Sequence, residues 1–440
     1  MLVLKFGGTS VGSIENIKNV KNIINDGQRK VVVLSAMSGT TNALVALSDC
    51  IKFKETENAF KQITKLHNTY KTTVAELIHQ IDLKIEVDSY VDSVFALLKS
   101  LTEVNHTSLV HNNIVAQGEL LSTFIFSRFL IQEGLNACLM PALDFMRVDK
   151  TNEPDNFYIK QNLNRIINQL PAATIYITQG FICLDANGHI SNLQRGGSDY
   201  TATIIGSVLN ANEVQIWTDI DGFHNNDPRF VTNTTALSNM SFDEAAELAY
   251  FGAKILHPQT VMPVRSANIP VRLKNTMNPH TFGTVITNEI HGEGIKAIAA
   301  KDGITAIKIK SARMLLAHGF LKKVFEIFER YQTSIDMITT SEIAISLTID
   351  DETHLQSIVE ELEQFALVEV DTYRSIVCLV GNAIVYHPDT HHLFQILQDV
   401  NVRMISYGGS NNNISLLINT SDKQETLQKL HRYIFEMAMV

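Results

Sequence analysis

The chain has 440 residues, of which 45% are hydrophobic and 19% are charged. That length suffices for two or three domains, each with its own hydrophobic core. Acidic residues outnumber basic ones by 46 to 36, the formal net charge is −10, and no Lys/Arg-rich run occurs, so a nucleic-acid partner is not expected. No uninterrupted apolar run reaches the roughly 18 residues of a membrane span, and the N-terminus lacks a signal-peptide pattern. We therefore expect a cytoplasmic protein with no membrane partner.

The cysteines and histidines form no recognisable metal-binding pattern. The four cysteines are Cys50, Cys138, Cys183 and Cys378. Their spacing fits neither a zinc site nor a dense disulfide framework, so we expect small buried hydrophobic residues in a reducing compartment. The tightest histidine group is His387, His391 and His392, which falls at an expected helix start. We favour a helix surface there over the alternative of a metal site.

The first expected elements are those of a parallel sheet covered by helices. Residues 2–6 predict a strand, which is followed by a glycine turn, an amphipathic helix over about 13–25 and a second strand over 30–36. Apolar residues then recur at spacings of three and four, which predicts helices over 42–135. Further strands are expected over 173–178, 213–217 and 269–274. The glycine loops between them are candidate ligand sites, because loops after parallel strands carry ligands in such sheets.

A turn-rich stretch over residues 274–294 predicts a domain boundary near residue 293. Beyond it, the order strand, helix, strand, strand, helix, strand is expected over 304–310, 320–331, 334–339, 343–349, 353–365 and 367–371. The same order begins again over 376–381, 390–400, 403–407, 414–418 and 423–435. Asp336 corresponds to Arg403 at an offset of 403 − 336 = 67 residues, which indicates two copies of one small fold. The second copy lacks its last strand, which residues 437–440 could supply, unless they pair with the first copy.

Three segments in the first half combine glycines with polar groups. KFGGTS (5–10) places a lysine before two glycines at a strand-to-helix turn, which suits a phosphate but also a tight packing turn. SAMSGTTN (35–42) offers hydroxyl groups for an oxyanion or for a helix N-cap. QGELLS (117–122) places one carboxylate at the expected head of an apolar helix, where it could instead satisfy the helix dipole.

Further segments of this kind follow. QRGGSDYT (194–201) supplies an arginine suited to bidentate carboxylate binding, and an aspartate that could orient a lysine, bind an ammonium or act through a magnesium-bound water. A glycine turn with an aspartate cap is the alternative. WTDIDG (217–222), DPR (227–229) and FGAKILHP (251–258) indicate a nucleotide-facing loop and two more cations for phosphates. Individually, each could be a turn or a surface charge.

In this order and spacing, the segments resemble the aspartate kinases of the amino-acid-kinase family over essentially the whole chain. The C-terminal pair of small folds resembles the two ACT domains of that family. GFL (319–321) and SIDMITTSE (334–342) are most similar to the monofunctional, lysine-sensitive type. The resemblance implies an α/β protein: an amino-acid-kinase fold, with a parallel-rich open sheet between helices, followed by two βαββαβ ACT units. It implies a catalytic domain over 1–293 and ACT domains over 300–374 and 375–440.

The resemblance also implies an activity and its site. ATP with Mg²⁺ would phosphorylate the side-chain carboxylate of L-aspartate, giving 4-phospho-L-aspartate, the first step toward lysine, threonine, methionine and diaminopimelate. The Mg²⁺ would be held mainly by nucleotide phosphates, without a metal site on the protein. The catalytic residues would be Lys5 and Asp199. The ATP-binding residues would be Lys5, Phe6, Gly7, Gly8, Thr218, Asp219, His224, Arg229, Lys254 and Ile255. The aspartate-binding residues would be Ser35, Thr41, Glu119, Phe181, Arg195, Gly196, Gly197, Ser198 and Asp199.

Charge and chemistry refine these roles. We assign Glu119 to the α-ammonium of aspartate and Arg195 to its α-carboxylate. A carboxylate nucleophile has a pKa near 4 and needs no general base at neutral pH, so charge neutralisation and alignment should carry catalysis. His224 and Asp221 depart from the family pattern, which has a tyrosine and a proline at these positions of the nucleotide-facing loop.

Lysine is the effector that the resemblance implies, although threonine or no effector remain open. The corresponding residues are Met314, Ala317, Gly319, Phe320, Leu321, Ser334, Ile335, Asp336, Thr340, Ser341 and Glu342. Asp336 and Glu342 could instead be ordinary acids at strand ends. Because the effector site of relatives lies between ACT domains of two subunits, a homodimer through these domains is implied, with a tetramer as a further option.

Two other functions are weighed against this one. Another kinase of the same fold could act on glutamate, carbamate or UMP, but the opposite charges of Glu119 and Arg195 suit an α-amino acid, and two ACT units favour amino-acid regulation. A non-catalytic amino-acid sensor is the second alternative, against which Lys5, Asp199 and Lys254 argue. A fused homoserine dehydrogenase is not expected, because no residues follow the second ACT unit.

Overall fold

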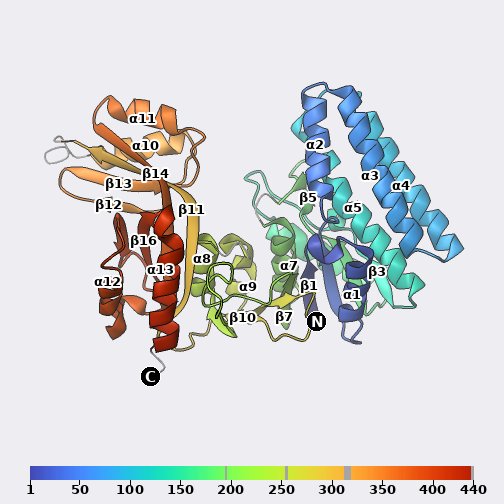
Figure 1. Ribbon diagram of the computed structural model, residues 1–440. Coiled ribbons are helices and arrows are strands. Elements are labelled where there is room, and N and C mark those ends of the chain that lie inside the picture. Colours follow the sequence, from blue (N-terminus) through green and yellow to red (C-terminus); the bar gives the residue numbers. More distant parts are fainter. Residues whose placement is uncertain (194–195, 253–255, 312–318, 438–440) are drawn as a thin grey trace. The chain divides into compact units, whose positions relative to one another are not determined.

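The computed structural model describes residues 1–193, 196–252, 256–311 and 319–437, in two compact units (Figure 1). Unit 1 consists of Met1–Phe223 and Leu256–Asn288. Unit 2 consists of His224–Ile255 and Glu289–Val440. Residues 224–255, which we expect within the catalytic domain by sequence, are therefore grouped with the C-terminal unit.

The core of unit 1 is a largely parallel sheet. Its strands are β1 (Leu2–Phe6), β2 (Lys30–Leu34), β3 (Ala137–Leu139), β4 (Ile175–Gln179), β7 (Glu213–Thr218), β9 (Val271–Asn275) and β10 (Thr284–Thr287). Within unit 1 they lie in the order β3-β4-β2-β1-β7-β9-β10; β10 runs antiparallel to β9, and the other neighbouring pairs are parallel. Every residue of β2 and β4 is buried, as expected of strands covered on both faces.

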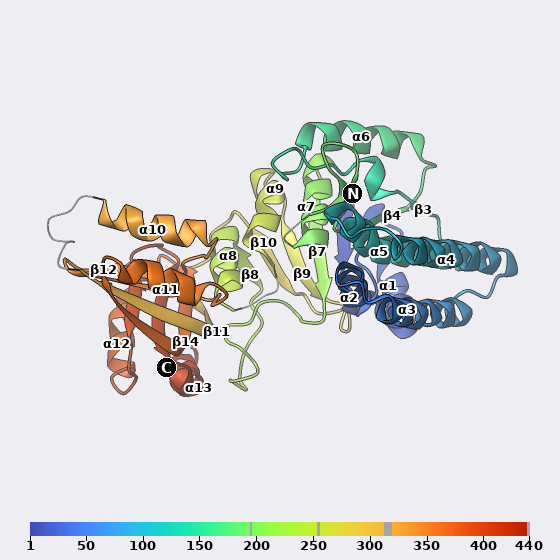
Figure 2. The same cartoon turned by 90° about the horizontal axis from the view of Figure 1, so that it is seen from above.

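Helices cover both faces of this sheet. One face carries α1 (Ile14–Ile24), α2 (Thr40–Lys52), α3 (Thr56–Leu77), α4 (Ile81–Leu101) and α5 (Ser108–Gln132), whose apolar side chains share one core with alternate strand residues. The other face carries α6 (Asn156–Gln169), α7 (Gly197–Val208) and α9 (Met262–Ser266), as Figure 2 shows. The short strands β5 (Ile182–Leu184) and β6 (Ile190–Asn192) form a separate hairpin. The expected strands and the helical stretch over 42–135 are confirmed.

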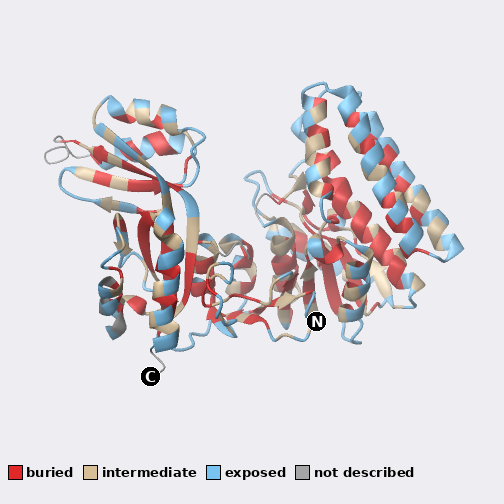
Figure 3. Cartoon of the chain, viewed as in Figure 1, coloured by how far each residue is buried: buried red, intermediate tan, exposed pale blue. Residues whose placement is uncertain are grey.

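Helix α5 is the central helix of this core. Among the described residues it alone is long and apolar enough to cross a membrane, judged by length and composition. However, 78% of its apolar window is buried inside the protein, and Figure 3 shows it buried while α3 and α4 expose their outer faces. It therefore has the character of a core helix.

Unit 2 is built on a six-stranded antiparallel sheet. Two long strands run through its centre, β11 (Gly294–Lys310) and β14 (Leu367–Asn382). The remaining strands are β12 (Ile338–Thr340), β13 (Ala344–Ile349), β15 (Met404–Tyr407) and β16 (Asn413–Asn419), and the order is β12-β13-β11-β14-β16-β15. The sheet is covered by α10 (Phe320–Arg330) and α11 (Leu355–Glu363) over one half, and by α12 (Leu393–Ile396) and α13 (Lys423–His431) over the other. Unit 2 also contains β8 (Asn239–Ser241) and α8 (Phe242–Tyr250).

Each half of the sheet has the strand order of one βαββαβ fold, which agrees with the expected repeat. The strand missing from the second copy comes from the segment before the first copy: residues 294–301 of β11 pair with residues 376–382 of β14. Met437 instead ends a π-helical turn (Arg432–Met437), and residues 438–440 lie outside the described part of the chain. The two copies are thus interlocked, because the second copy takes its fourth strand from the segment that precedes the first.

Candidate active site

The predicted site residues of unit 1 that the structure describes gather near the carboxyl edge of the parallel sheet. β1 lies between β2 and β7, and the chain runs from β1 to β2 on one side and reaches β7 on the other only much later. Such a switch in strand order opens a crevice at the carboxyl ends of the strands, where α/β proteins bind ligands. Gly7 and Gly8 follow β1 at this point and lead into the 3-10 turn Thr9–Val11.

Lys5 and Asp199 form an ion pair at this edge. Lys5 is the penultimate residue of β1, and Asp199 lies in the first turn of α7, which packs on β1. The Lys5 Nζ to Asp199 Oδ1 distance is 2.8 Å, and the two side chains are only 13% and 14% exposed. Gly196 is the N-cap residue of α7 and has a left-handed φ of 61°, and its carbonyl accepts a hydrogen bond from the Asp199 backbone N–H. The glycine turn therefore places the Asp199 carboxylate beside the Lys5 ammonium.

Residues that follow β2 and β4 pack closely against Ser198. Ser35, which follows β2, donates a hydrogen bond from its hydroxyl to Ser198 Oγ at 2.9 Å. Gly180 follows β4, and a Cβ atom on it would lie 2.4 Å from both Cβ and Oγ of Ser198. Phe181 has a left-handed φ of 67°, and its backbone N–H is held by Thr201 Oγ1 at 3.0 Å. Gly197 lies next to the Phe181 ring.

Glu119 is the buried acid of the site. It lies in the middle of α5, which begins at Ser108, so the expected place at a helix head is wrong and the helix-dipole alternative falls with it. The residue is 3% exposed, and its Oε1 accepts a hydrogen bond from the Ala36 backbone N–H at 3.2 Å. Oε2 is buried without a hydrogen-bond partner among the described residues. Burial raises the pKa of Glu119 to about 7, although the bond from Ala36 opposes the rise.

Sequence reasoning missed the residues that hold this region together. Ser122 donates to the Ser35 carbonyl at 2.8 Å, and Gln179 donates to Thr123 at 2.7 Å, so that α5 is tied to the ends of β2 and β4. Tyr70 is fully buried and shares a hydrogen bond of 3.0 Å with Thr40, which lies next to the predicted substrate residue Thr41. A hydroxyl in an apolar helix carries no sequence signal of its partner. For Ser122 and Thr123, the available signal was that they are polar residues within an otherwise apolar helix.

Two of the predicted nucleotide-binding residues lie at the end of β7. Thr218 is the last residue of that strand, and its hydroxyl donates to Asp219 at 3.0 Å. Phe6 stacks on Trp217 at a ring distance of 5.5 Å. Sequence reasoning overlooked Lys274, on the neighbouring strand β9, whose ammonium lies 5.1 Å from the centre of the Trp217 ring. Burial lowers the pKa of this lysine.

Other predicted nucleotide-binding residues belong to unit 2 or lie outside the residues that the structure describes. The His224 ring shares a hydrogen bond of 3.0 Å with Thr234. Arg229 is exposed and pairs within its own turn with Asp227 at 2.6 Å, and this pairing raises the pKa of the arginine. Arg195, Lys254 and Ile255 lie outside the described residues.

The predicted effector residues surround the start of α10 and strand β12. Gly319 begins α10 with a left-handed φ of 92°, Phe320 is nearly buried, and Leu321 is exposed. Asp336 has a side chain that is only 1% exposed and pairs with Lys301 at 2.9 Å. The other predicted residues of the β12 region are half-buried or exposed; they are Ser334, Ile335, Thr340, Ser341 and Glu342. Met314 and Ala317 lie outside the described residues.

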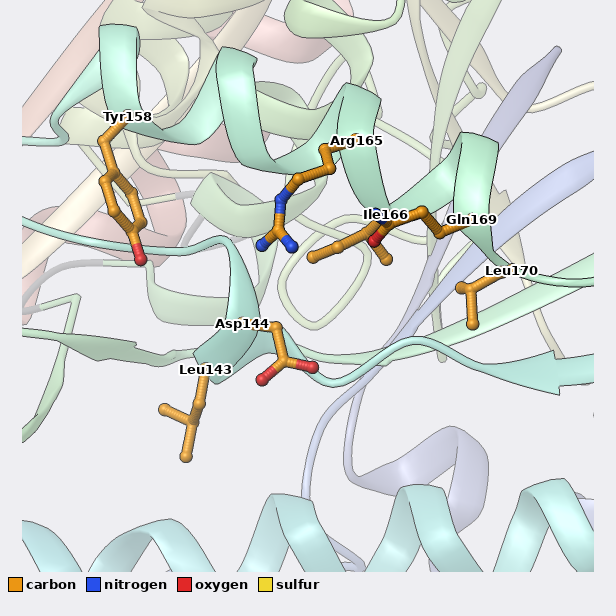
Figure 4. A pocket seen from close by; sticks show the side chains of 7 residues that line it. All are labelled: Leu143, Asp144, Tyr158, Arg165, Ile166, Gln169 and Leu170. Carbon is orange, nitrogen blue, oxygen red and sulfur yellow. The ribbon is translucent and has the colours of Figure 1, made fainter.

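One pocket in unit 1 lies apart from this constellation. It measures about 480 Å³ and lies between the 3-10 turn Ala142–Asp144 and α6. Figure 4 shows Asp144, Tyr158 and Arg165 lining it. None of the predicted site residues lines it.

Comparison with known proteins shows which family the chain belongs to. Residues 1–275 match the Amino acid kinase family, and residues 377–433 match an ACT domain. The chain is 33% identical over 455 residues to lysine-sensitive aspartokinase 3 of Escherichia coli, and the match covers 99% of both chains. The chain belongs to the aspartokinase family. Aspartokinase 1, chloroplastic, of Arabidopsis thaliana is 35% identical over 464 residues, covering 99% of this chain and 80% of the relative.

Solved structures of aspartokinases share the fold. E. coli aspartokinase III in complex with aspartate and ADP (R-state) matches with a TM-score of 0.84 at 33% identity, covering 99% of this chain and all of that one. The same enzyme in complex with lysine and aspartate (T-state) matches with a TM-score of 0.83. Aspartate kinase from Clostridium acetobutylicum matches with a TM-score of 0.85 at 27% identity. These matches confirm the predicted α/β amino-acid-kinase fold with C-terminal ACT units.

Proposed function

We propose that this aspartokinase-family protein transfers the γ-phosphoryl group of ATP to the side-chain carboxylate of L-aspartate and forms 4-phospho-L-aspartate. One observation carries the proposal: three polar contacts at the carboxyl edge of the sheet, which are joined through residues adjacent in the chain. They run from Glu119 to the Ala36 backbone, from the adjacent Ser35 to Ser198, and from the adjacent Asp199 to Lys5. Full-length relatives named aspartokinases and a matching structure with aspartate and ADP support it.

The chemistry requires little from the protein beyond alignment and charge. One aspartate Oδ attacks the γ-phosphorus while the bond to the β–γ bridging oxygen breaks, so that the acyl phosphate and ADP are formed without a proton transfer. The ionised carboxylate is already the nucleophile at neutral pH. The barrier is the repulsion between this anion and the polyphosphate, which a lysine at the reacting centre lowers. Lys5 fits that role, and Asp199 holds its ammonium in place.

The substrate-binding roles follow from charge. Glu119, with one buried carboxylate oxygen unpaired among the described residues, is suited to the α-ammonium of aspartate. Ser198, fixed by Ser35 and by the close approach of Gly180, is suited to one of the two carboxylates. By resemblance, Arg195 binds the α-carboxylate, and Lys254 joins Lys5 in neutralising the phosphates. Mg²⁺ would accompany ATP, bound mainly by phosphate oxygens, and would neutralise charge on them.

We further propose the finer organisation of the protein. The catalytic domain would span 1–293 and the ACT domains 300–374 and 375–440, with 294–301 completing the second ACT sheet. Lysine would act as a feedback inhibitor, an assignment supported by the E. coli relative named lysine-sensitive and its structure with lysine. Homodimers would form through the ACT domains, whose outermost strands β12 and β15 each have an unpaired edge within the described sheet. A cytoplasmic location would suit the four free cysteines.

A substrate panel tests the activity. ADP formation from MgATP is measured with aspartate, glutamate, carbamate or UMP as acceptor, using an Asp199→Asn variant as the inactive control. We expect turnover with aspartate and a far lower rate with each other acceptor. Turnover with glutamate, carbamate or UMP that matches or exceeds that with aspartate would contradict the proposal.

A further inference from the structure

Asp336 links the predicted effector site to the helix α8. Its Oδ1 accepts hydrogen bonds from the hydroxyl of Tyr250 at 2.7 Å and from the ammonium of Lys301 at 2.9 Å. Tyr250 is the last residue of α8, and Lys301 lies in β11. Hydrogen bonds to an ionised acceptor are the stronger kind. A predicted effector residue is therefore joined directly to a helix that sequence reasoning places in the catalytic domain.

The charges around Asp336 leave room for one more cation. Lys301 lies between Asp336 and Asp350, at 2.9 and 2.8 Å, so that one positive charge serves two carboxylates. Oδ2 of Asp336 is buried and has no hydrogen-bond partner among the described residues. An unpaired buried carboxylate oxygen in a group with a net charge of −1 favours an ammonium. An amino-acid effector with a side-chain ammonium has the matching chemistry.

Helix α8 and Gly252 contact strand β11 of the six-stranded sheet at several points. Glu244 of α8 is buried and pairs with Lys296 of β11 at 2.7 Å. The ammonium of Lys301 lies 4.7 Å from the centre of the Tyr250 ring. Gly252 has a left-handed φ of 145°, and a Cβ atom on it would lie 2.3 Å from the Ala300 carbonyl oxygen. Tyr250 at the end of α8 and Gly252 just after it therefore lie directly on β11, next to Lys301.

We propose that Tyr250 is a positioning residue that transmits effector binding at Asp336 to the segment after α8 and thereby to ATP binding. In the sequence, the predicted phosphate ligand Lys254 follows Tyr250 by four positions. An ammonium bound to Oδ2 draws charge away from Oδ1 and weakens the bond from Tyr250, so the end of α8 loses one anchor. Because coupling between two sites is reciprocal, ATP must weaken effector binding by the same factor. The inference rests on the proposed kinase activity and on lysine as effector.

The first test replaces Tyr250 with phenylalanine, which keeps the ring of a side chain that is 43% exposed. The matched control is Tyr331→Phe, because Tyr331 also donates to a carboxylate of unit 2, Glu361 at 2.8 Å, but not to Asp336. Calorimetry measures ADP binding with and without lysine, and lysine binding alone. We expect Tyr250→Phe to reduce the effect of lysine on ADP affinity by about 10-fold, the equivalent of one charge-assisted hydrogen bond, while lysine still binds. The control should behave as the unaltered protein does.

A second test needs neither lysine nor turnover. ADP affinity is measured for Tyr250→Phe, for Asp336→Asn and for the double variant, with circular dichroism to confirm folding. We expect the double variant to match the more affected single variant, because both substitutions break the same link. Additive effects, or full lysine sensitivity in Tyr250→Phe, would overturn the inference. Failure of the proposed function is a separate result, since it shows as absent aspartate phosphorylation in the unaltered protein, whereas ADP calorimetry still decides whether Tyr250 and Asp336 are coupled.

Discussion

The titration of Glu119 gives a sharp prediction for aspartate binding. Burial raises the pKa of this carboxyl to about 7, and only the ionised form can pair with an ammonium. The apparent dissociation constant scales inversely with the competent fraction, which is about 0.9 at pH 8 and about 0.1 at pH 6 for a pKa of about 7. Aspartate affinity should therefore fall about 10-fold between these two pH values, while the charges of free aspartate do not change over that range.

Aspartate affinity should rise with pH, whereas the contribution of Glu119 to folding stability should fall with pH. A carboxyl whose folded-state pKa lies above its unfolded value favours folding at low pH, and that contribution is lost as pH rises through the folded pKa. The difference between 4.5 and about 7 corresponds to about 3 kcal/mol lost above pH 7 in the substrate-free protein. Glu119→Gln should therefore raise the free energy of unfolding at pH 8 by up to about 3 kcal/mol, and change it little near pH 4.

The assay combines calorimetric aspartate titrations at pH 6 and 8 with urea unfolding at pH 4 and 8. Glu133→Gln is the control, because this acid lies just past the end of the same helix and pairs at the surface with Lys21. Glu119→Gln should bind aspartate weakly, without the pH dependence, and be more stable at pH 8. An unchanged pH dependence of aspartate binding in Glu119→Gln would refute the reasoning.

Three further substitutions test the site. Lys5→Met should reduce kcat by at least about 10²-fold, because it removes the cation at the transferred phosphoryl group, and a near-normal rate in a coupled ADP assay would rule out that role. Gly180→Ala places a methyl group within 2.4 Å of Ser198, so KM for aspartate should rise by about 10-fold with little change in KM for ATP; an unaffected KM for aspartate would show that Ser198 is not a substrate ligand. Arg195→Ala should weaken the binding of aspartate far more than the binding of ATP. Equal effects on the two affinities would contradict the assignment of Arg195 to the α-carboxylate.

The sequence predicted the local elements well because they follow from local periodicity. Apolar spacing located the helices over 42–135, and the βαβ order located the parallel sheet. The pairing of residues 294–301 with 376–382 was not predicted, because strand pairing across some 80 residues leaves no mark in either segment. Helix α12 is shorter than the predicted helix over 390–400 because its first turn, Pro388–His392, is a 3-10 helix.

The candidate site was predictable where glycines accompany charged residues. Lys5, Asp199 and Glu119 were predicted in this way, and in the structure three polar contacts between adjacent residues lead from one to the next. The extent of Glu119 burial was not predictable, because it depends on the packing of α5 against β2 and β4. Ser122 and Tyr250 escaped notice for the same reason: a serine in an apolar helix and a tyrosine 86 residues from its carboxylate partner have no local signature.

One measurement tests the central claim most directly, namely trapping of the acyl phosphate. The protein is incubated with MgATP, L-aspartate and hydroxylamine, and the resulting hydroxamate is identified by mass spectrometry. We predict aspartate 4-hydroxamate in an amount that matches the ADP released, and almost none with Lys5→Met. ADP release without hydroxamate, or no reaction of aspartate at all, would contradict the assignment of this site as an aspartate kinase.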